Sequence, residues 1–412
     1  MWRRERTEPV PDGTEVASAQ VARLLIPFSF AAFLGFLAIG IPLPVLPDYV
    51  NRQLGYGPIL VGGIVGLQSM ATLLTRQIAG RLCDTRGPKR TTLLGLGSAS
   101  LAGLLYLMSG ALAGQAAVAL TVLVAGRLLM GLGESLFITA LVAWSIARVG
   151  HAHAGRAMAW SGIAMYGALA IGAPLGTLVQ AWSGFAAVAL CAILLPGAGA
   201  ILVLRWSDIR IAAGPRASFV KILGLIWAPG LAMALASSGV GTIAAFLTLR
   251  YHAQNWAGTG FALTGFGAAY ILVRLLFGGL PDRIGGYRVA VISLLIEAAG
   301  QLVIWHAGSS VAAFCGATLT GLGYSLVFPS LGIEAIRRVG VANRGLVLGA
   351  YLACFDLGLA IAGPVAGVVA GAFDLPATFI AASVAAMLAV VLTLTSYAQS
   401  RPDRRRPDRS PS

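Results

Sequence analysis

The sequence predicts an all-α membrane protein whose twelve transmembrane helices form two pseudo-symmetric bundles of six. Of the 412 residues, 58% are apolar and 11% are charged, whereas about a quarter of the residues of a soluble domain are charged. Apolar segments recur along the chain, each about 20 residues long, which is the length a helix needs to cross a bilayer. The second half of the chain also repeats patterns of the first. Together these observations exclude a soluble globular protein.

The apolar segments fall into two sets of six. The first set lies near residues 24–47, 58–80, 91–113, 116–143, 157–180 and 184–204, and the second near 223–249, 258–280, 287–307, 311–335, 345–372 and 375–397. The longest internal polar stretch separates the sets. We therefore expect a cytoplasmic tail at 1–22, a six-helix bundle at 23–204, a cytoplasmic linker at 205–222, a second bundle at 223–398 and a disordered cytoplasmic tail at 399–412.

The basic residues lie mostly in alternate loops. With the N-terminus placed in the cytoplasm, 24 of the 29 Lys and Arg residues fall in the tails and loops on that side, while the opposite side has Arg52 and Arg250. Such an imbalance is typical of the cytoplasmic side of a membrane protein. We expect a multi-pass protein of a bacterial-type cell inner membrane with both termini in the cytoplasm.

The sequence offers no cofactor or metal site. Its net charge of +14 is divided into small clusters between apolar segments instead of one basic face, so no nucleic-acid partner is expected. The four cysteines have neither disulfide nor metal-ligand spacing. The nucleotide-binding, zinc and nucleophile motifs of common enzymes do not occur in a suitable context. We expect a monomer that is not an enzyme and whose partners are a small-molecule solute, protons as coupling ion, and the lipid bilayer.

Three patterns recur in both halves. Residues Gly80–Arg90 and Gly278–Arg288, 198 positions apart, share Gly, Leu, Asp, Gly and Arg at identical spacing. Gly131–Ser135 has a counterpart in Gly321–Ser325, and Gly-Ala-Pro at 172–174 has one in Ala-Gly-Pro at 362–364. Parallel repeats of six helices are an observed transporter architecture.

The first of these patterns resembles a family signature. The loop Gly80–Arg90 is similar to the motif between helices 2 and 3 of the major facilitator superfamily, and the resemblance extends over all twelve predicted helices. Arg127 with Gly131 and Gly133 resembles the second motif of that superfamily, and Gly167 through Gly176 its antiporter motif. The patterns at 67–68, 75–76, 234–237, 283–286 and 326–329 resemble the YhhS and YfcJ branch of arabinose-efflux-permease-like proteins. The resemblance implies two bundles that rock about a central site and expose it alternately to each side.

The resemblance also assigns a gating role to the repeated loops. The Asp84 carboxylate would hold the cytoplasmic helix ends together when the protein faces outward. The residues assigned to this gating motif are Gly80, Arg81, Asp84, Gly87, Arg90, Asp282 and Arg283. The alternative is that these loop acids are solvated and only help to set the topology.

Ionisable residues inside apolar segments are the candidates for chemistry, because a charged side chain at a helix centre costs about 2.5–3.5 kcal/mol on insertion scales. Arg127 and Glu134 are seven residues apart and share one helix face, so Arg127 is a candidate to bind an anionic group or pair with an acid. Glu134 and Asp356 are the candidate proton carriers, since burial favours the neutral form of an acid. The alternative is a structural pair for Arg127 and a neutral, hydrogen-bonded acid at the other two positions.

Further polar residues are weaker candidates. Arg76 and Arg274 each precede the aspartate of their repeated loop by eight residues, which favours a scaffolding role, and long Arg side chains can also extend to the headgroups. Glu297 belongs to the same group, and Gln68 is an uncharged candidate for lining the path. Close helix packing is expected where small residues and prolines recur, at Gly172, Pro174, Gly176, Gly363 and Pro364.

The sequence thus favours a secondary active transporter, with proton-coupled efflux as the first hypothesis. A proton-coupled uptake symporter is the alternative, because direction depends on gradients that a sequence does not encode. An integral-membrane enzyme would need a clustered catalytic set at one membrane face, and a transporter-like sensor would bind a solute without moving it. Both are weaker hypotheses.

Overall fold

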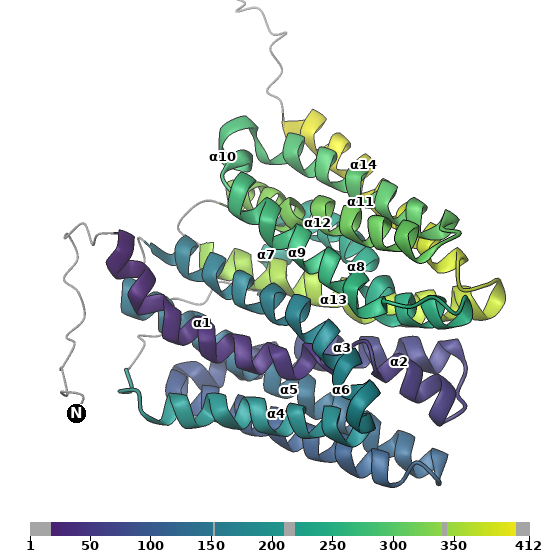
Figure 1. Cartoon of the computed structure of the whole chain (residues 1–412). Helices are drawn as coiled ribbons and strands as arrows, with labels where there is room; N and C mark the ends of the chain where they lie inside the picture. Colours follow the sequence, from purple (N-terminus) through teal and green to yellow (C-terminus); the bar gives the residue numbers. More distant parts are fainter. Residues whose placement is uncertain (1–17, 151–152, 210–218, 340–343, 401–412) are drawn as a thin grey trace, which may run out of the picture.

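The protein consists almost entirely of helices, arranged as two bundles side by side (Figure 1). This computed structural model describes residues 18–150, 153–209, 219–339 and 344–400. Within these residues, eleven helices are long and apolar enough to cross a membrane. One bundle is formed by the N-terminal half of the chain and the other by the C-terminal half (Figure 1). The predicted all-α membrane architecture is therefore confirmed.

The N-terminal half contains five long helices and two short ones. The helices are α1 (Ser18–Gly40), α2 (Leu46–Asp48), the π-helix η1 (Tyr49–Gln53), α3 (Pro58–Arg86), α4 (Pro88–Ala111), α5 (Ala116–Val149) and α6 (Ala154–Leu204). The 51-residue α6 combines two predicted crossings and contains one non-helical residue, Gly184, at φ 70°. Eleven long helices therefore correspond to twelve predicted crossings, and a kink takes the place of the expected loop.

The C-terminal half has one crossing per long helix. Its helices are α7 (Phe219–Leu225), α8 (Trp227–Ala253), α9 (Thr259–Phe277), α10 (Leu280–Ile284), α11 (Gly286–His306), α12 (Ser310–Val339), α13 (Arg344–Ala372) and α14 (Ala377–Ser400). The chain is already helical at residue 18, inside the predicted tail, and α7 begins inside the predicted linker. The rest of the tails and residues 210–218 of the linker lie outside the described residues.

The repeated loops form matching turns. Gly87 has φ +85° between α3 and α4, and Gly285 has φ +97° at the start of α11. Each glycine N–H donates to the carbonyl oxygen four residues earlier, Cys83 or Pro281, over 3.1 Å. Only glycine adopts such φ values without strain. The glycine shared by the two loops is thus explained by the turn that each bundle needs at this point.

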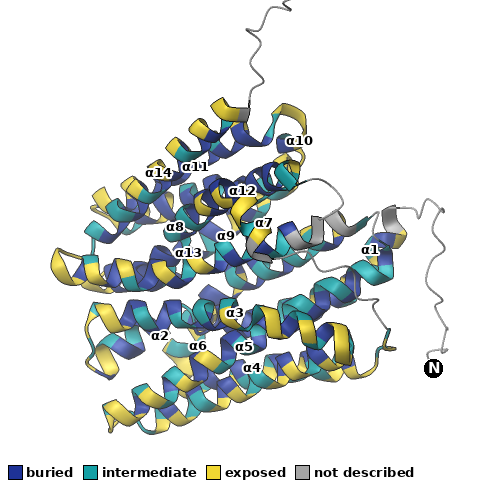
Figure 2. Ribbon diagram, turned by 180° about the vertical axis from the view of Figure 1, so that it is seen from behind, coloured by how far each residue is buried: buried dark blue, intermediate teal, exposed yellow. Residues whose placement is uncertain are grey.

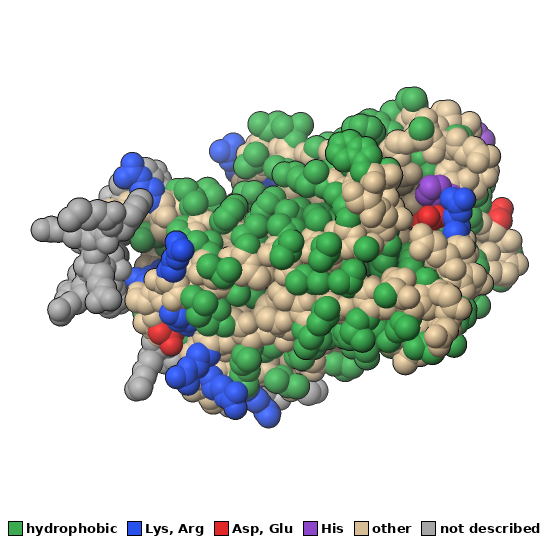
Figure 3. Space-filling model, turned by 60° about the horizontal axis from the view of Figure 1, so that its bottom comes forward, with side chains coloured by type: hydrophobic (Ala, Val, Ile, Leu, Met, Phe, Trp, Pro, Cys, Tyr) green, Lys and Arg blue, Asp and Glu red, His purple; other side chains and the backbone are tan. Residues whose placement is uncertain are grey.

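The outer surface is apolar around the middle and basic at one end. Exposed residues lie along the outward sides of the helices (Figure 2), and many are large and apolar, such as Leu74, Leu194, Phe261 and Leu276. Figure 3 shows this apolar belt, with Lys and Arg side chains gathered at one end. We call this end, which carries the Gly80–Arg90 and Gly278–Arg288 loops, the basic end, and the opposite one the far end. The pattern fits a multi-pass membrane protein.

Candidate functional site

The two halves meet mainly along two helix pairs, α3 with α13 and α6 with α9, which we call the α3–α13 seam and the α6–α9 seam. Near the far end both seams are closed by backbone contact. A Cβ atom on Gly62 would lie 2.0 Å from the carbonyl oxygen of Gly363, and one on Gly267 would lie 2.3 Å from Cβ of Ala170. Only glycine allows helices to approach this closely.

The predicted packing residues divide between these seams and the N-terminal bundle. Pro364 lies in the α3–α13 seam, where its Cδ is 2.9 Å from the position of a Cβ on Gly66, and Pro174 lies in the α6–α9 seam beside Gly260. Gly172 and Gly176 instead pack against Gly40 and Ile41 at the end of α1. The repeated Gly-Ala-Pro and Ala-Gly-Pro patterns thus place a proline in each seam. Gly363 lies where α3 and α13 approach each other most closely.

The α3–α13 seam is open towards the basic end. Gly80 lies 18 residues after Gly62, and Gly349 lies 18 residues before Gly367, so each is five turns along the same helix face. Gly62 and Gly367 contact the opposite helix, whereas Gly80 and Gly349 would have nothing within 4 Å of an added Cβ. The halves therefore touch near the far end and diverge towards the basic end.

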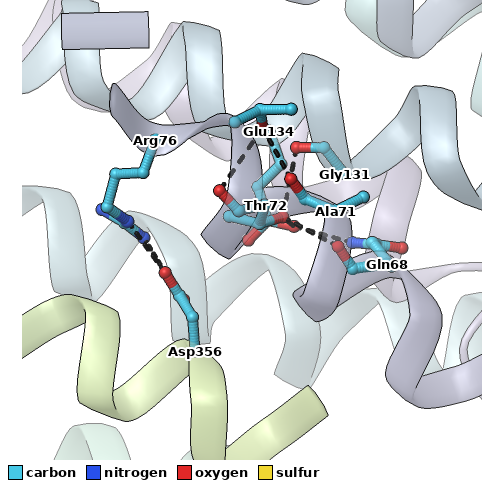
Figure 4. A network of polar contacts seen from close by, with 8 residues as sticks. Gln68, Ala71, Thr72, Arg76, Gly131, Glu134 and Asp356 are labelled. Atoms are coloured by element: carbon cyan, nitrogen blue, oxygen red, sulfur yellow. Dashed lines mark hydrogen bonds and ion pairs between the residues drawn. The ribbon is translucent and has the colours of Figure 1, made fainter. Parts of the chain in front are cut away.

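A polar network lies beside the α3–α13 seam, in the N-terminal half (Figure 4). Gln68 Nε2 donates to Glu134 Oε2 over 2.8 Å, and the Thr72 hydroxyl lies 3.2 Å from the same oxygen. α3 and α5 can bring these side chains together because α5 has glycine at Gly131, where a Cβ would lie 2.3 Å from the carbonyl oxygen of Gln68. The structure thus joins two predicted site residues, Gln68 and Glu134. It adds Thr72, which the sequence did not indicate.

One ion pair connects the two halves at this level. Arg76 of α3 donates to Oδ2 of Asp356 on α13 through Nε, over 2.8 Å, and through Nη2 (Figure 4). The side chains are 18% and 5% exposed, so water screens the pair little. Arg76 therefore does not extend to the headgroups, and Asp356 is not an isolated acid. The pair lies where the closed part of the α3–α13 seam ends.

Arg127 has a structural environment. It is 2% exposed, and its Nε and Nη2 donate to the carbonyl oxygens of Ile64 and Val65 over 2.9 and 3.0 Å. The guanidinium therefore links α5 to α3 through backbone acceptors, which favours the structural alternative over a role in binding a solute. Glu297 of α11 is fully buried against Gly239 of α8, and neither carboxylate oxygen has a hydrogen-bond partner among the described residues.

An aromatic cluster lies beside the α6–α9 seam. The rings of Tyr166 from α6 and Tyr270 from α9 stack with centroids 3.7 Å apart, and the Tyr324 ring of α12 lies 6.2 Å from that of Tyr270. Arg274 donates to the Tyr270 hydroxyl, and its guanidinium carbon lies 5.2 Å from the centre of that ring. The sequence reasoning singled out Arg274 but missed all three tyrosines.

The two clusters occupy equivalent positions of the two halves. Helices α3 and α9 correspond at 198 positions, as in the repeated loops, so Thr72 and Arg76 match Tyr270 and Arg274. α5 and α12, and α6 and α13, correspond at 190 positions, as the repeated glycines and prolines show. By these offsets Glu134 matches Tyr324 and Asp356 matches Tyr166. Applying the repeat to every predicted site residue would have found Tyr270, Tyr324 and Tyr166 from the sequence.

The predicted gating residues all lie at the basic end, in two separate loops, one in each half. Arg81, Asp84 and Arg90 are exposed around the turn between α3 and α4, and Asp282 and Arg283 are exposed on α10. The same turn is tied to the end of α6, because Lys89 Nζ donates to the carbonyl oxygens of Leu204 and Trp206 over 2.8 and 2.6 Å. This arrangement anchors the loop, while the latch role of Asp84 stays a prediction.

Comparison with known proteins identifies the family. The model of the Major Facilitator Superfamily matches residues 28–249 and 226–412. A Burkholderia pseudomallei (strain 1106a) protein described as an uncharacterized MFS-type transporter is 44% identical over 365 residues, which cover 89% of this chain and 90% of that protein. Another from Pseudomonas aeruginosa (strain UCBPP-PA14), with the same description, is 41% identical over 393 residues, covering 95% and 98%.

Solved structures of the same fold are distant in sequence. The nucleoside transporter NupG has a TM-score of 0.69 at 14% identity and covers 91% of this chain and 98% of its own. The human organic anion transporter MFSD10 (TETRAN) has a TM-score of 0.68 at 17% identity, with coverage of 90% and 99%. These likenesses show the fold, and the family match shows membership. The chain belongs to the major facilitator superfamily.

Proposed function

We propose that this transporter moves a small solute by alternating access and exports it in exchange for protons. The observation that carries the proposal is the Arg76–Asp356 ion pair, which joins the two halves where the closed seam ends. A protein that alternates between two openings needs an interaction between the halves that can be made and broken. A charge pair buried at that point meets this requirement.

Proton binding is the proposed event that breaks the pair. When Asp356 takes up a proton it becomes neutral, and its charge-assisted bonds to Arg76 are weakened. Arg76 then lacks a buried counter-charge, which is costly in a low-dielectric environment. Glu134 lies close enough to Arg76 to interact with it electrostatically. Arg76 is therefore proposed to pair with Asp356 and with Glu134 in turn, so that one proton is exchanged as the seam rearranges.

The direction of transport rests on the resemblance to the YhhS and YfcJ branch, whose members are usually described as exporters. Uptake by proton symport uses the same residues and is the alternative. In this proposal the basic end faces the cytoplasm of a bacterial inner membrane, and the conformation described here is open to that side. The two neighbours of known structure are described as nucleoside and organic anion transporters, which supports a small organic solute.

The test uses everted membrane vesicles with an acidic interior. Solutes from a metabolite and drug panel are added while a pH-sensitive dye reports the gradient, and an exchanged solute dissipates it. We expect dissipation with the wild-type chain and its loss in Asp356→Asn and Glu134→Gln. Arg156→Gln, an exposed basic residue of α6 outside the predicted site, is the control. Full pH-dependent transport in both acid variants would overturn the proton assignment.

Two further measurements separate the other hypotheses. Accumulation in right-side-out vesicles would support uptake in place of efflux. Solute binding to the purified protein without flux in either vesicle type would indicate a sensor.

A further inference from the structure

The two seams differ in the residue that lies across from the arginine. Arg76 and Arg274 occupy equivalent positions of α3 and α9, and the residues opposite them, Asp356 and Tyr166, occupy equivalent positions of α13 and α6. Arg76 therefore has a carboxylate across its seam, and Arg274 has a tyrosine. Among the described residues, the ion pairs of the protein involve Arg52, Arg76, His252 and Arg337, and none involves Arg274.

Arg274 faces the seam and not the lipid. On α9, Gly260, Gly267 and Ile271 contact α6, at Thr177, Ala170 and Gly167 respectively. Arg274 lies seven residues after Gly267, two turns along the same face. The exposed leucines of this turn are Leu272, Leu275 and Leu276, which lie on other sides of the helix.

The position is also reachable from the basic end. The contact between the seam helices loosens from Gly267 to Ile271, whose Cδ1 is 3.8 Å from a Cβ on Gly167. Gly278, eighteen residues after Gly260, would meet only Arg274 of its own helix. Arg274 is itself partly exposed. It therefore lies where the closed part of the α6–α9 seam ends, as Arg76 does in the other seam.

The Arg274 guanidinium points towards the tyrosine cluster and not towards the lipid headgroups. It donates to the Tyr270 hydroxyl, one turn closer to the far end, and Tyr166 and Tyr351 are within its electrostatic range. Because Tyr270 accepts from Arg274, its own O–H can be donated to a second group beside the guanidinium. A cation and a hydroxyl donor held side by side are suited to an anion.

We propose that Arg274 and Tyr270 recognise the negative charge of the transported solute, which is a small organic anion. The anion takes the place beside Arg274 that the Asp356 carboxylate has beside Arg76. The tyrosine rings contribute apolar contact surface for the organic part. This inference names the substrate class of the proposed function. It rests on that function in one respect, namely that the solute bound at this site is the solute that is transported.

The test measures binding to the purified full-length protein, without a membrane gradient. Thermal-shift screening uses a panel of small carboxylates, sulfonates and phosphate monoesters, each beside its neutral amide or ester. We expect stabilisation by anions and not by their neutral counterparts. Arg274→Gln should weaken binding of each stabilising anion about 10- to 100-fold, as expected for the loss of a charged hydrogen bond. Arg274→Lys should retain part of the affinity.

A second variant uses the difference between the seams. Tyr166→Asp supplies the carboxylate that the α6–α9 seam lacks, so it should abolish anion binding while the protein still melts cooperatively. Stabilisation by neutral solutes alone, no stabilising anion in the panel, or unchanged anion affinity in Arg274→Gln and Tyr166→Asp would each overturn the inference. Failure of proton coupling would leave these binding results unchanged, so the two proposals fail separately.

Discussion

The two seams share a backbone and differ in side chains. Both are closed near the far end by glycines at equivalent positions, Gly62 and Gly260, and both open towards the basic end next to an arginine, Arg76 or Arg274. The α3–α13 seam has acids and amides around its arginine, whereas the α6–α9 seam has tyrosines. The repeat therefore preserved the residues that control helix approach, and the chemistry diverged at positions where any side chain of suitable size is accommodated.

The largest expected effect on transport comes from blocking the shared backbone contact. Gly62→Leu places a side chain where Gly363 approaches, and overpacking of this kind costs about 1–3 kcal/mol. The state closed at the far end should therefore be depleted about 5- to 150-fold, with a matching loss of flux. Cross-linking between Ile59→Cys and Gly371→Cys, in a chain without the four native cysteines, measures that closure.

Gly63→Leu is the matched control, because an added Cβ at Gly63 has nothing within 4 Å. It should leave cross-linking and flux near wild type. Equal effects of the two substitutions would show that bulk in α3, and not the crossing with α13, is responsible.

The ion pair should matter next. Asp356→Asn leaves Arg76 buried without its counter-charge and should lower the free energy of unfolding by about 3 kcal/mol. Arg76→Gln combined with Asp356→Asn should recover most of that loss, since both charges are then gone. Denaturant unfolding in detergent measures both variants. A double variant as unstable as the single one would contradict the assigned pairing.

Arg127 distinguishes structure from recognition. Arg127→Met removes the donors to the Ile64 and Val65 carbonyl oxygens and should cost about 2 kcal/mol of stability. Solute affinity, measured by titration of the purified protein, should stay at the wild-type value. Arg274→Gln should show the opposite pattern. A loss of affinity in Arg127→Met at unchanged stability would restore the sequence-based expectation that Arg127 binds a solute.

The smallest effect is expected within the polar network. Thr72→Val removes a hydroxyl that contacts the Gly131 carbonyl oxygen and Glu134 on α5 and should lower stability by about 1 kcal/mol. Thr75→Val is the control, because the Thr75 hydroxyl bonds to carbonyl oxygens of its own helix, the nearer being that of Ala71. Thermal unfolding of both variants gives the difference. Equal losses would mean that the contacts of Thr72 with α5 contribute nothing.

The fold could be predicted from sequence because its signals are long and repeated. Apolar segments of bilayer length, alternating basic loops and the paired Gly80 and Gly278 loops lead to the two bundles without any knowledge of contacts. The predicted break between the fifth and sixth crossings falls next to Gly184, where a single glycine turns the chain with no polar segment to mark it.

The candidate site could be predicted only in part. The cost of burying a charge singles out Arg76, Glu134 and Asp356, but it does not say which of them pair, because partners 280 residues apart meet only through the tertiary fold. Tyrosines carry no such cost and gave no signal in one half considered alone. For Arg127 the sequence left a structural and a binding role open, since backbone acceptors such as the Ile64 carbonyl on α3 have no sequence signature.

The glycine crossings bear on how the molecule assembles. The halves pack against each other through their own helices, at Gly62 against Gly363 and at Ala170 against Gly267. The covalent link between the halves then ensures that they are made in equal numbers. It is not needed to align them, because the glycine contacts do that. Two separately translated halves, inserted into one membrane, should find each other and reconstitute a working transporter.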